Sequence, residues 1–163
     1  MVNLPVLTFV FILAIPYSAA VQCRGGWIGF EDSCYYLSHG VATWAEAGGV
    51  CKMLGGFLAM IERADELTFL KSALNNLHHN DASTKQYWID GNDLEIENVW
   101  RWIKTGQTIT FTDWAPGEPN AAENDNCLNL WGKSGFRYAD NDCEEHYNYV
   151  CQIRDPEETE IVG

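Results

Sequence analysis

The sequence predicts a single domain of the α+β class, in which two helices accompany several short strands. Its length of 163 residues fits one domain. Two segments carry helix signals, and several shorter runs rich in aromatic and aliphatic residues are typical of strands. A composition of 47% hydrophobic and 13% aromatic residues supplies enough apolar area for a core and argues against disorder.

The elements expected first lie between the first cysteine and the middle of the chain. Two aromatic-rich runs that flank a polar turn predict a β-hairpin over residues 23–37. Thr43 and Glu46 have the spacing of a capping box, which predicts a helix that begins there and ends at the glycine pair 55–56. The apolar residues 57–61 predict a short strand that follows this helix.

A second helix is expected over residues 65–76, because leucines fall on one face of it, at positions Leu67, Leu70 and Leu74. Strands are expected at 87–89 and 100–102, where tryptophans alternate with other residues. A final strand over 150–153 is expected to close the domain.

Residues 91–142 are expected to form a long, ordered polar loop, since Asp, Asn, Glu and Gly crowd between tryptophans there. Side-chain oxygens gather in two stretches, 117–126 and 140–142. Calcium takes roughly six to eight oxygen ligands, mostly carboxylates and carbonyls, so this loop is a candidate calcium site. The alternative is a solvated acidic loop, and the spacing of an EF-hand is absent.

The two ends of the chain have their own character. Residues 1–20 contain no charged residue and include an apolar run followed by small residues, which predicts a cleaved secretory signal peptide. The alternatives are a buried helix or an uncleaved membrane anchor. We expect a secreted, extracellular protein with a domain over 21–154, an acidic tail over 155–163 and no membrane insertion.

The formal charge of -13 (10 Lys+Arg against 23 Asp+Glu) bounds the function. Nucleic acid is not an expected partner, because its phosphates would meet a surface of the same sign. The negative charge is more compatible with binding to cations, cationic partners or mineral surfaces. The alternative is that the surface carboxylates only keep the protein soluble. An enzyme is not expected, because the carboxylates are loop-borne and no nucleophile elbow or phosphate loop is present.

All six cysteines lie after the predicted signal peptide: Cys23, Cys34, Cys51, Cys127, Cys143 and Cys151. In an oxidising compartment an even number predicts disulfides, although spacing alone does not choose among the possible pairings. A zinc site is disfavoured because no Cys-x2-Cys pair is present.

An ordered set of residues over about 23–153 strongly resembles the C-type lectin family: Cys23, Gly26-Trp27, Ser33-Cys34-Tyr35, Trp44, Ala47, Cys51, Gly55-Gly56, Leu58-Ala59, Ile61, Glu66, Tyr87-Trp88-Ile89, Trp100, Trp102, Trp114, Gly117-Glu118-Pro119-Asn120, Cys127, Cys143 and Cys151. Residues 87–102 are most similar to perlucin-type secreted lectins of molluscs. The resemblance implies a double-loop fold with two helices flanking small antiparallel sheets. It also implies three disulfides, Cys51–Cys151, Cys127–Cys143 and Cys23–Cys34.

Glu118-Pro119-Asn120 matches the motif of family members with mannose-type specificity, in which the Glu–Pro bond is cis. The resemblance implies that Glu118 and Asn120 each give calcium one oxygen and keep a second polar group for the sugar. Sugars with vicinal equatorial hydroxyls, such as mannose, fucose and N-acetylglucosamine, can bind both. Asp125 and Asp140 are expected to complete the calcium and carbohydrate site.

Two departures from the family pattern predict weaker calcium binding. Asp125 stands where the family has Glu, with Glu123 as an alternative ligand. Ala139 stands where the family has Asn, and Asn141-Asp142 could replace it only if the loop shifts by two residues. With these departures, the resemblance still implies five protein oxygens and two sugar hydroxyls as ligands. That number of ligands is within the range that calcium takes.

The family's auxiliary calcium site is matched in part. Asp93 and Glu97 keep the expected spacing, and Asp125 and Asn126 would complete the site, whereas Ala121 falls where a further oxygen is usual. The alternative is a pair of surface carboxylates before Trp100.

We therefore expect a calcium-dependent lectin that recognises glycans on microbial or cell surfaces, as in innate immunity. One sugar site binds weakly, so we expect that several copies of the chain associate as a homo-oligomer to gain avidity. Two alternatives stay open: a matrix or biomineral-associated protein, suggested by the acidity, and a protein-binding domain with a degenerate calcium site, suggested by Ala139.

Overall fold

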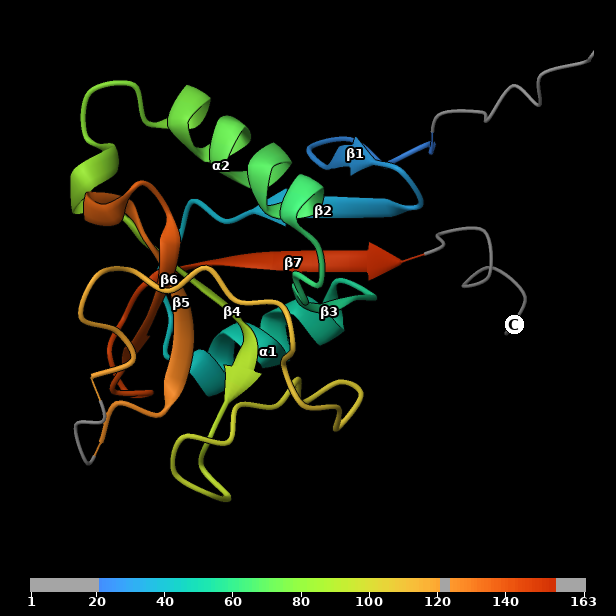
Figure 1. The fold of residues 1–163 in the computed structure, drawn as a ribbon. Helices are drawn as coiled ribbons and strands as arrows, with labels where there is room; N and C mark the ends of the chain where they lie inside the picture. The colour runs from blue at the N-terminus through green and yellow to red at the C-terminus, as the bar shows by residue number, and fades with distance from the viewer. Residues whose placement is uncertain (1–20, 121–123, 155–163) are drawn as a thin grey trace, which may run out of the picture.

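The structure is a computed structural model that describes residues 21–120 and 124–154 (Figure 1). The expected signal peptide 1–20 and acidic tail 155–163 lie outside the described residues, as do two positions considered for calcium, Ala121 and Glu123. Within the described ranges, no helix is long and apolar enough to cross a membrane.

The strands form one sheet in the order β1-β2-β7-β4-β5-β6, with β3 added against β7. Their bounds are β1 (Ile28–Phe30), β2 (Ser33–Leu37), β3 (Phe57–Leu58), β4 (Gln86–Asn92), β5 (Cys127–Trp131), β6 (Arg137–Asn141) and β7 (Asn148–Arg154). The fold class is confirmed, and one detail differs from the small antiparallel sheets that the resemblance implied. Strands β4 and β7 pair in parallel, so the two sheets join into a single mixed sheet.

Helix α1 (Trp44–Met53) begins at the predicted capping box. The Glu46 N–H donates to Thr43 Oγ1 at 3.3 Å, and the Thr43 N–H donates to the Glu46 carboxylate at 3.1 Å. The helix buries Ala47 and Cys51 against the sheet. The chain leaves the helix through Gly55, whose φ of 74° is a conformation that side chains disfavour.

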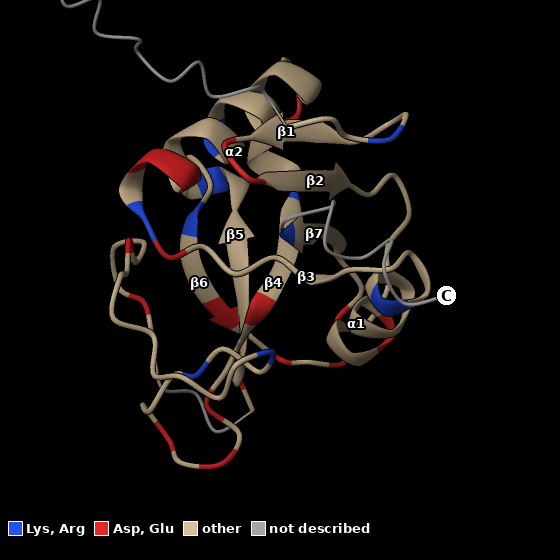
Figure 2. Ribbon diagram, turned by 90° about the vertical axis from the view of Figure 1, so that its right-hand side faces the viewer, with Lys and Arg blue, Asp and Glu red and all other residues tan. Residues whose placement is uncertain are grey.

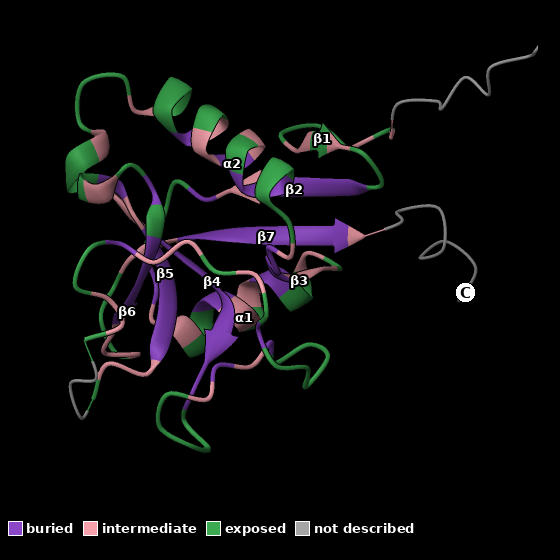
Figure 3. Ribbon diagram, viewed as in Figure 1, coloured by how far each residue is buried: buried purple, intermediate pink, exposed green. Residues whose placement is uncertain are grey.

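Helix α2 (Ala64–Leu77) buries the predicted leucine face, together with Glu66. The two helices serve two separate apolar clusters. Under α2, the cluster includes its leucines together with Ile89 and Val150. Against α1, the cluster includes Trp88 and Tyr149. Figure 3 shows the central strands buried along most of their length, while β1 and much of the loop surface are more exposed.

Two expectations about strands are wrong. Residues 91–142 are not one polar loop, because they contain β5 and β6 as well as the loop. Leu128, Asn129 and Leu130 are all fully buried in β5, and the polar residues between and around the leucines made the segment resemble a loop. Residues 100–102 form no strand, since only Arg101 makes single bridges, to Asn92 and Thr108.

The apolar run at 57–61 contains a strand of only two residues, β3. Ala59, the residue after β3, still makes backbone hydrogen bonds to a strand on each side. Its N–H donates to the Val150 carbonyl at 2.9 Å, and its carbonyl accepts from the Asp90 N–H at 2.8 Å. The segment is therefore buried backbone between β7 and β4.

Disulfides fasten the fold at three places, and each pair is the one that the resemblance implied. Cys51–Cys151 links α1 to β7, Cys23–Cys34 fastens the N-terminal segment to β2, and Cys127–Cys143 links the two ends of the β5–β6 hairpin.

A long loop leaves the sheet at the end of β4 and returns at the start of β5, and its described parts are 93–120 and 124–126. The part of the loop that follows β4 lies at the end of the molecule away from α2 (Figures 1 and 2), whereas Asp113 farther along the loop pairs with Lys71 of α2. Trp114 anchors the loop by a bridge to Tyr138 of β6, and the centroids of their rings lie 5.9 Å apart. The loop is therefore held on the sheet by aromatic contacts.

Candidate functional site

The predicted Glu-Pro-Asn motif lies on a turn that β6 holds in place. The Ala115 N–H donates to the Tyr138 carbonyl at 2.8 Å, and the Glu118 N–H closes the turn on the Ala115 carbonyl at 2.9 Å. The Glu118–Pro119 peptide bond is cis, as the resemblance implied. The motif therefore follows directly from a segment paired with β6.

Asp140 lies beside this turn, on β6, with only 2% of its surface exposed. The backbone N–H of Asn120 donates to both of its carboxylate oxygens, at 3.2 Å each. Asp140 was expected in a loop, but it belongs to a strand, and its side chain reaches the motif from there. This contact brings together residues that are 20 positions apart in the chain.

Asp125 approaches the same turn from the end of the long loop, two residues before β5 begins. The side-chain amide of Asn120 donates to Asp125 Oδ2 at 3.4 Å. Leu128 pairs with Asp140 in the β5–β6 ladder, so the residues just before β5 and the end of β6 share one edge. The Cys127–Cys143 disulfide closes this edge. The structure thus places Glu118, Asn120, Asp125 and Asp140 close together.

Without a bound cation, the neighbouring carboxyl groups of this cluster repel each other when both are ionised. Burial, together with the hydrogen bond and the charge of the adjoining Asp140 carboxyl, raises the pKa of Glu118 to about 7. The Oε2 atom of Glu118 is buried and has no hydrogen-bond partner. Two carboxyls this close retain a proton unless a cation neutralises them.

The donor chemistry fits calcium. The cluster offers carboxylate and amide oxygens, which are hard ligands, and one of those oxygens is buried without a partner. Among residues 21–120 and 124–154, no group of three or more His, Cys, Asp and Glu is close enough to hold a metal by itself. The candidate set therefore depends on the amide of Asn120 as well as on the carboxylates.

The auxiliary candidates are brought together only in part. The Asp93 N–H donates to the Asn126 carbonyl at 3.3 Å, so these two residues are neighbours. One Asp93 oxygen accepts from the Asn98 N–H at 2.8 Å, and the other is buried without a partner. Burial raises the pKa of Asp93, and the charges of Glu97 and Asp140 add to this. Glu97 is exposed and accepts from the Asn98 amide at 3.3 Å.

The residues considered as substitutes for the missing Asn are engaged elsewhere. Asn141 accepts a hydrogen bond from the Tyr147 hydroxyl at 2.9 Å, and Asp142 accepts one from the Glu144 N–H at 3.0 Å. Ala139 is buried and lies opposite Asn129 in the ladder. The loop shift that would bring Asn141 and Asp142 into the site is therefore not present.

Sequence reasoning missed Arg101, which lies beside Asp93 in a hollow of about 250 Å³ under the long loop. The Nε atom of Arg101 is buried and has no hydrogen-bond partner. The available signal was a lone arginine inside a stretch dominated by acidic and amide side chains.

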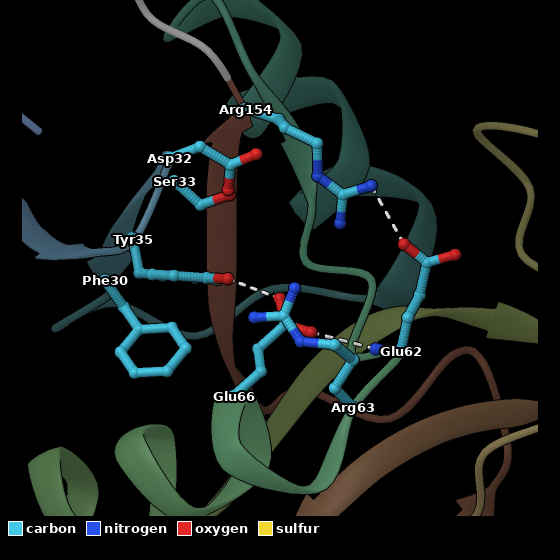
Figure 4. A pocket seen from close by; sticks show the side chains of 8 residues that line it. All are labelled: Phe30, Asp32, Ser33, Tyr35, Glu62, Arg63, Glu66 and Arg154. Atoms are coloured by element: carbon cyan, nitrogen blue, oxygen red, sulfur yellow. Dashed lines mark hydrogen bonds and ion pairs between the residues drawn. The ribbon is translucent and has the colours of Figure 1, made fainter. Parts of the chain in front are cut away.

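A larger hollow of about 310 Å³ lies away from the long loop, between β2, α2 and β7 (Figure 4). Its floor contains Glu66 and Tyr35, both buried, whose side chains are hydrogen-bonded to each other. Arg154 and Glu62 form an ion pair at 2.8 Å on its rim. These polar groups are partnered within the protein, so the hollow is a weaker candidate than the loop cluster.

Comparison with known proteins supports the resemblance. The Lectin C-type domain family matches residues 41–153. A perlucin-like protein of Mytilus galloprovincialis is 27% identical over 136 residues, which cover 82% of this chain and 85% of that protein. Perlucin of Haliotis laevigata is 32% identical over 130 residues, covering 77% and 81% respectively.

Solved structures are similar as well. The cow CD23 carbohydrate-recognition domain, determined with a GlcNAc2Man3 oligosaccharide, matches with a TM-score of 0.69 and 31% identity, over 82% of this chain and 96% of that one. A calcium-independent type II antifreeze protein shares the fold at a TM-score of 0.71 and 24% identity, over 85% and 98%.

The family match covers both helices, strands β3 to β7 except the last residue of β7, and the loop that carries the cluster. It confirms the expectation that the domain is a carbohydrate-recognition type of module and not an enzyme. The chain belongs to the C-type lectin domain family.

Proposed function

We propose that this protein is a secreted, calcium-dependent lectin that binds mannose-type sugars through Glu118, Asn120, Asp125 and Asp140. One observation carries the proposal. The buried, unpartnered Oε2 of Glu118 lies in a turn next to the buried Asp140 carboxyl, an arrangement that a cation would complete. Calcium neutralises the negative charge of the two carboxylates, and it can also coordinate the oxygen atoms of the sugar hydroxyls.

The remaining polar groups of the site select the sugar. Glu118 keeps a carboxylate oxygen that accepts, and Asn120 keeps an NH2 group that donates, after each gives one oxygen to calcium. Two vicinal equatorial hydroxyls offer a donor and an acceptor in the matching order. A sugar with one axial hydroxyl leaves a polar group unpaired, at a cost of about 1–3 kcal/mol.

The glycan partners follow from the same chemistry. The cow CD23 domain, 31% identical, was solved with a mannose-containing oligosaccharide, which supports glycan binding for this chain. We propose terminal mannose, fucose or N-acetylglucosamine on microbial or cell surfaces as targets, in an innate immune role. A single site gives weak binding, so several copies would act together.

The first experiment is retention of the refolded mature chain 21–163 on a mannose column, loaded with calcium and eluted with a chelator. We expect retention in calcium and release by the chelator. The double variant Glu118→Gln, Asn120→Asp should lose mannose retention, because it exchanges the donor and acceptor. Equal retention of this variant would overturn the site assignment.

The double variant leaves the net charge unchanged, and a control variant tests separately whether the loss of one carboxylate affects retention. Glu144→Gln removes an exposed carboxylate outside the motif and should leave retention unchanged. Loss of retention in this control would show that net charge, and not the motif, holds the protein on the column.

A second candidate function is a domain that binds a mineral surface, or a protein partner with a degenerate calcium site, instead of mannose-type sugars. Ala139 favours it, because alanine offers no side-chain oxygen where the family has Asn, and its buried position in β6 leaves no room for a loop shift. This candidate predicts adsorption to calcium carbonate, or to a protein partner, that excess mannose does not reverse. Competition by mannose would rule it out.

Secretion and the chain boundaries belong to the same proposal. We propose cleavage after residue 20, which leaves a domain over 21–154 and the acidic segment 155–163. N-terminal sequencing of the protein from the medium of expressing cells should begin at Val21. Retention of the protein in the membrane fraction would contradict this.

A further inference from the structure

The positive charges of this acidic protein are paired unevenly. All ten Lys and Arg residues lie in the described ranges, against 23 Asp and Glu in the whole chain. Five of the ten form ion pairs: Arg63, Lys71, Lys85, Arg137 and Arg154. The other five have no ion pair with a described residue, and three of these are exposed on one part of the surface: Arg24, Lys52 and Lys104.

Contacts place these three cations along the end of α1 and the start of β3. Lys52 is in the last turn of α1. The Arg24 guanidinium donates to the carbonyl of Leu54, the C-cap residue of the same helix. Lys104 Nζ lies 5.2 Å from the centre of the Phe57 ring in β3. We call Arg24, Lys52 and Lys104 the cationic patch.

Apolar side chains accompany the cationic patch. Met53 follows Lys52 in α1 and is 81% exposed. Cζ of Arg24 also lies 4.3 Å from the centre of the Trp27 ring, and Trp27 is half-buried. The surface therefore fits a ligand that carries several negative charges together with some apolar side chains.

An acidic segment of the same chain begins beside this surface. Residues 155–163, which lie outside the described residues, contain four Asp or Glu followed by Ile161 and Val162. The segment directly follows β7, and β7 pairs with β3 next to the end of α1 (Figure 1). The backbones are so close that a Cβ added to Gly56 would lie 2.4 Å from the Gln152 carbonyl oxygen. The segment therefore starts within a few residues of the cationic patch.

Physical reasons favour this tethered segment over a separate partner. A free polyanion, or a second copy of the chain, would be repelled by the net charge of -13 as it approached. The segment is held beside the patch by β7, so its effective concentration there is on the order of millimolar. Residues 155–163 span up to about 30 Å when extended, which leaves length to turn back from the end of β7 to α1.

We propose that residues 155–163 dock on the cationic patch of their own chain and close it to external polyanions. The carboxylates of the segment pair with Arg24, Lys52 and Lys104, and its aliphatic side chains cover Met53. The contact lies on the α1 side of the fold and does not depend on whether the calcium proposal holds.

The test uses the 15N-labelled chain 21–163 in a chelator, together with two triple variants that have the same net charge. The segment variant carries Glu157→Gln, Glu158→Gln and Glu160→Gln. The control variant carries three substitutions at exposed positions away from the segment: Glu95→Gln, Glu144→Gln and Glu145→Gln.

The amide signals of the patch give the first measurement. We expect those of Lys52, Met53 and Gly55 to differ from the wild type in the segment variant but not in the control variant. The difference should be present at about 0.01 M salt and absent at about 1 M, because the Debye length falls from about 30 Å to about 3 Å.

Variants of the patch identify the surface that the segment contacts. In the background Lys52→Met, Lys104→Met, the three segment substitutions should no longer move the Gly55 amide signal. Lys133→Met is the matched control, because Lys133 is an exposed cation without an ion pair that lies over the ring of Trp131. In that background the segment substitutions should move the Gly55 signal as they do in the wild type.

Heparin serves as a free polyanion that reports whether the cationic patch is open. We expect it to bind the segment variant at least about threefold more tightly than the control variant, since only the segment variant exposes the patch. Equal net charge in the two variants separates this effect from a general loss of repulsion.

Four outcomes would overturn the proposal. One is that the patch amides of the segment variant and the wild type coincide at low salt. Another is that the difference persists in Lys52→Met, Lys104→Met with the wild-type melting temperature. The third is a difference that depends on protein concentration, which would assign the contact to the segment of a second copy. The last is equal heparin binding by the two triple variants.

Discussion

Two groups of buried carboxyls at opposite parts of the molecule differ in how the protein treats them. Glu66, at the start of α2, is 4% exposed, and both of its oxygens accept hydrogen bonds (Figure 4). Tyr35 and Gln152 donate to one oxygen, and the Glu62 N–H donates to the other at 2.9 Å. Glu118, in the long loop, has a buried oxygen with no partner and a second carboxyl beside it.

The difference indicates which cluster is structural and which awaits a ligand. Burial raises the pKa of Glu66, but the hydrogen bonds from Tyr35 and Glu62 act against this rise. Around Glu118, burial and the neighbouring Asp140 carboxyl act in the same direction. A polar group paired inside the fold contributes to stability, whereas an unpaired one carries a cost that a bound ion can remove.

The largest expected effect comes from breaking the satisfied cluster. Glu66→Ala leaves the buried Tyr35 hydroxyl and the Glu62 N–H without an acceptor and opens a cavity, so we expect the free energy of unfolding to fall by about 3 kcal/mol or more. Urea unfolding monitored by tryptophan fluorescence measures this. Glu66→Gln keeps the volume and one acceptor and should lose less, about 1 kcal/mol.

A loss below about 1 kcal/mol for Glu66→Ala would contradict the comparison, because it would mean that the hydrogen bonds to Glu66 contribute little.

The next effect concerns the unsatisfied cluster and the removal of calcium. At a calcium concentration of about 100 times its Kd, the folded state should gain about 2.7 kcal/mol, and a chelator should remove this gain. Glu118→Gln should melt at the same temperature with and without calcium, whereas Glu144→Gln should respond like the wild type. Thermal melting in calcium and in chelator provides the measurement.

An equal response of Glu118→Gln to calcium would place the ion elsewhere, and Glu97→Gln would then be the variant to test, since Glu97 belongs to the auxiliary candidates.

A pH effect of similar or slightly smaller size is expected from Asp90, which lies in β4 where the long loop begins. Burial raises its pKa from 3.8 to about 6, although Lys104 donates a backbone hydrogen bond to it at 2.9 Å. The unfolded chain loses this proton first, so the stabilising contribution is complete below pH 3.8 and is lost as the pH rises through about 6. The loss amounts to about 2–3 kcal/mol.

Asp90→Asn should remove this part of the pH dependence, so its free energy of unfolding should change less than that of the wild type between pH 4 and 7. Urea unfolding at a series of pH values measures it, with the exposed Glu145→Gln as the control. Parallel curves for Asp90→Asn and the wild type would contradict the assignment.

The smallest effect is expected where charges are partly exposed and paired on the surface. Asp113 pairs with Lys71 of α2 and with Arg137 of β6, and so joins the loop to both elements. Lys71→Met should lower the free energy of unfolding by about 0.5 kcal/mol or less, because solvent screens such pairs. Its response to calcium should equal that of the wild type, as melting in calcium and chelator would show.

Local signals in the sequence were sufficient for the elements that depend on neighbouring residues. The capping box of Thr43 and Glu46 and the leucine face of α2 are where they were predicted. The strand of Trp100–Trp102 failed, because alternating tryptophans anchor a loop on the core there instead of forming a ladder.

Strands β5 and β6 were missed for a related reason. They contain Asn129, Asp140 and Asn141, which are typical of loops, and the sequence does not reveal that the sheet buries the first two. The resemblance supplied the disulfide pairs and the members of the candidate cluster. It did not reveal that Asp140 reaches the motif from a strand.

By itself, the sequence determined the two helices, the hairpin, the Glu-Pro-Asn motif and the surplus of carboxylates, since these depend on residue type and short spacing. Only the tertiary structure decided that β4 and β7 pair in parallel and which buried oxygens have partners. The physical reason is that a hydrogen-bond partner for a buried carboxyl comes from segments far apart in the chain. Gln152 lies 86 positions from Glu66, and Asp140 lies 20 positions from Asn120.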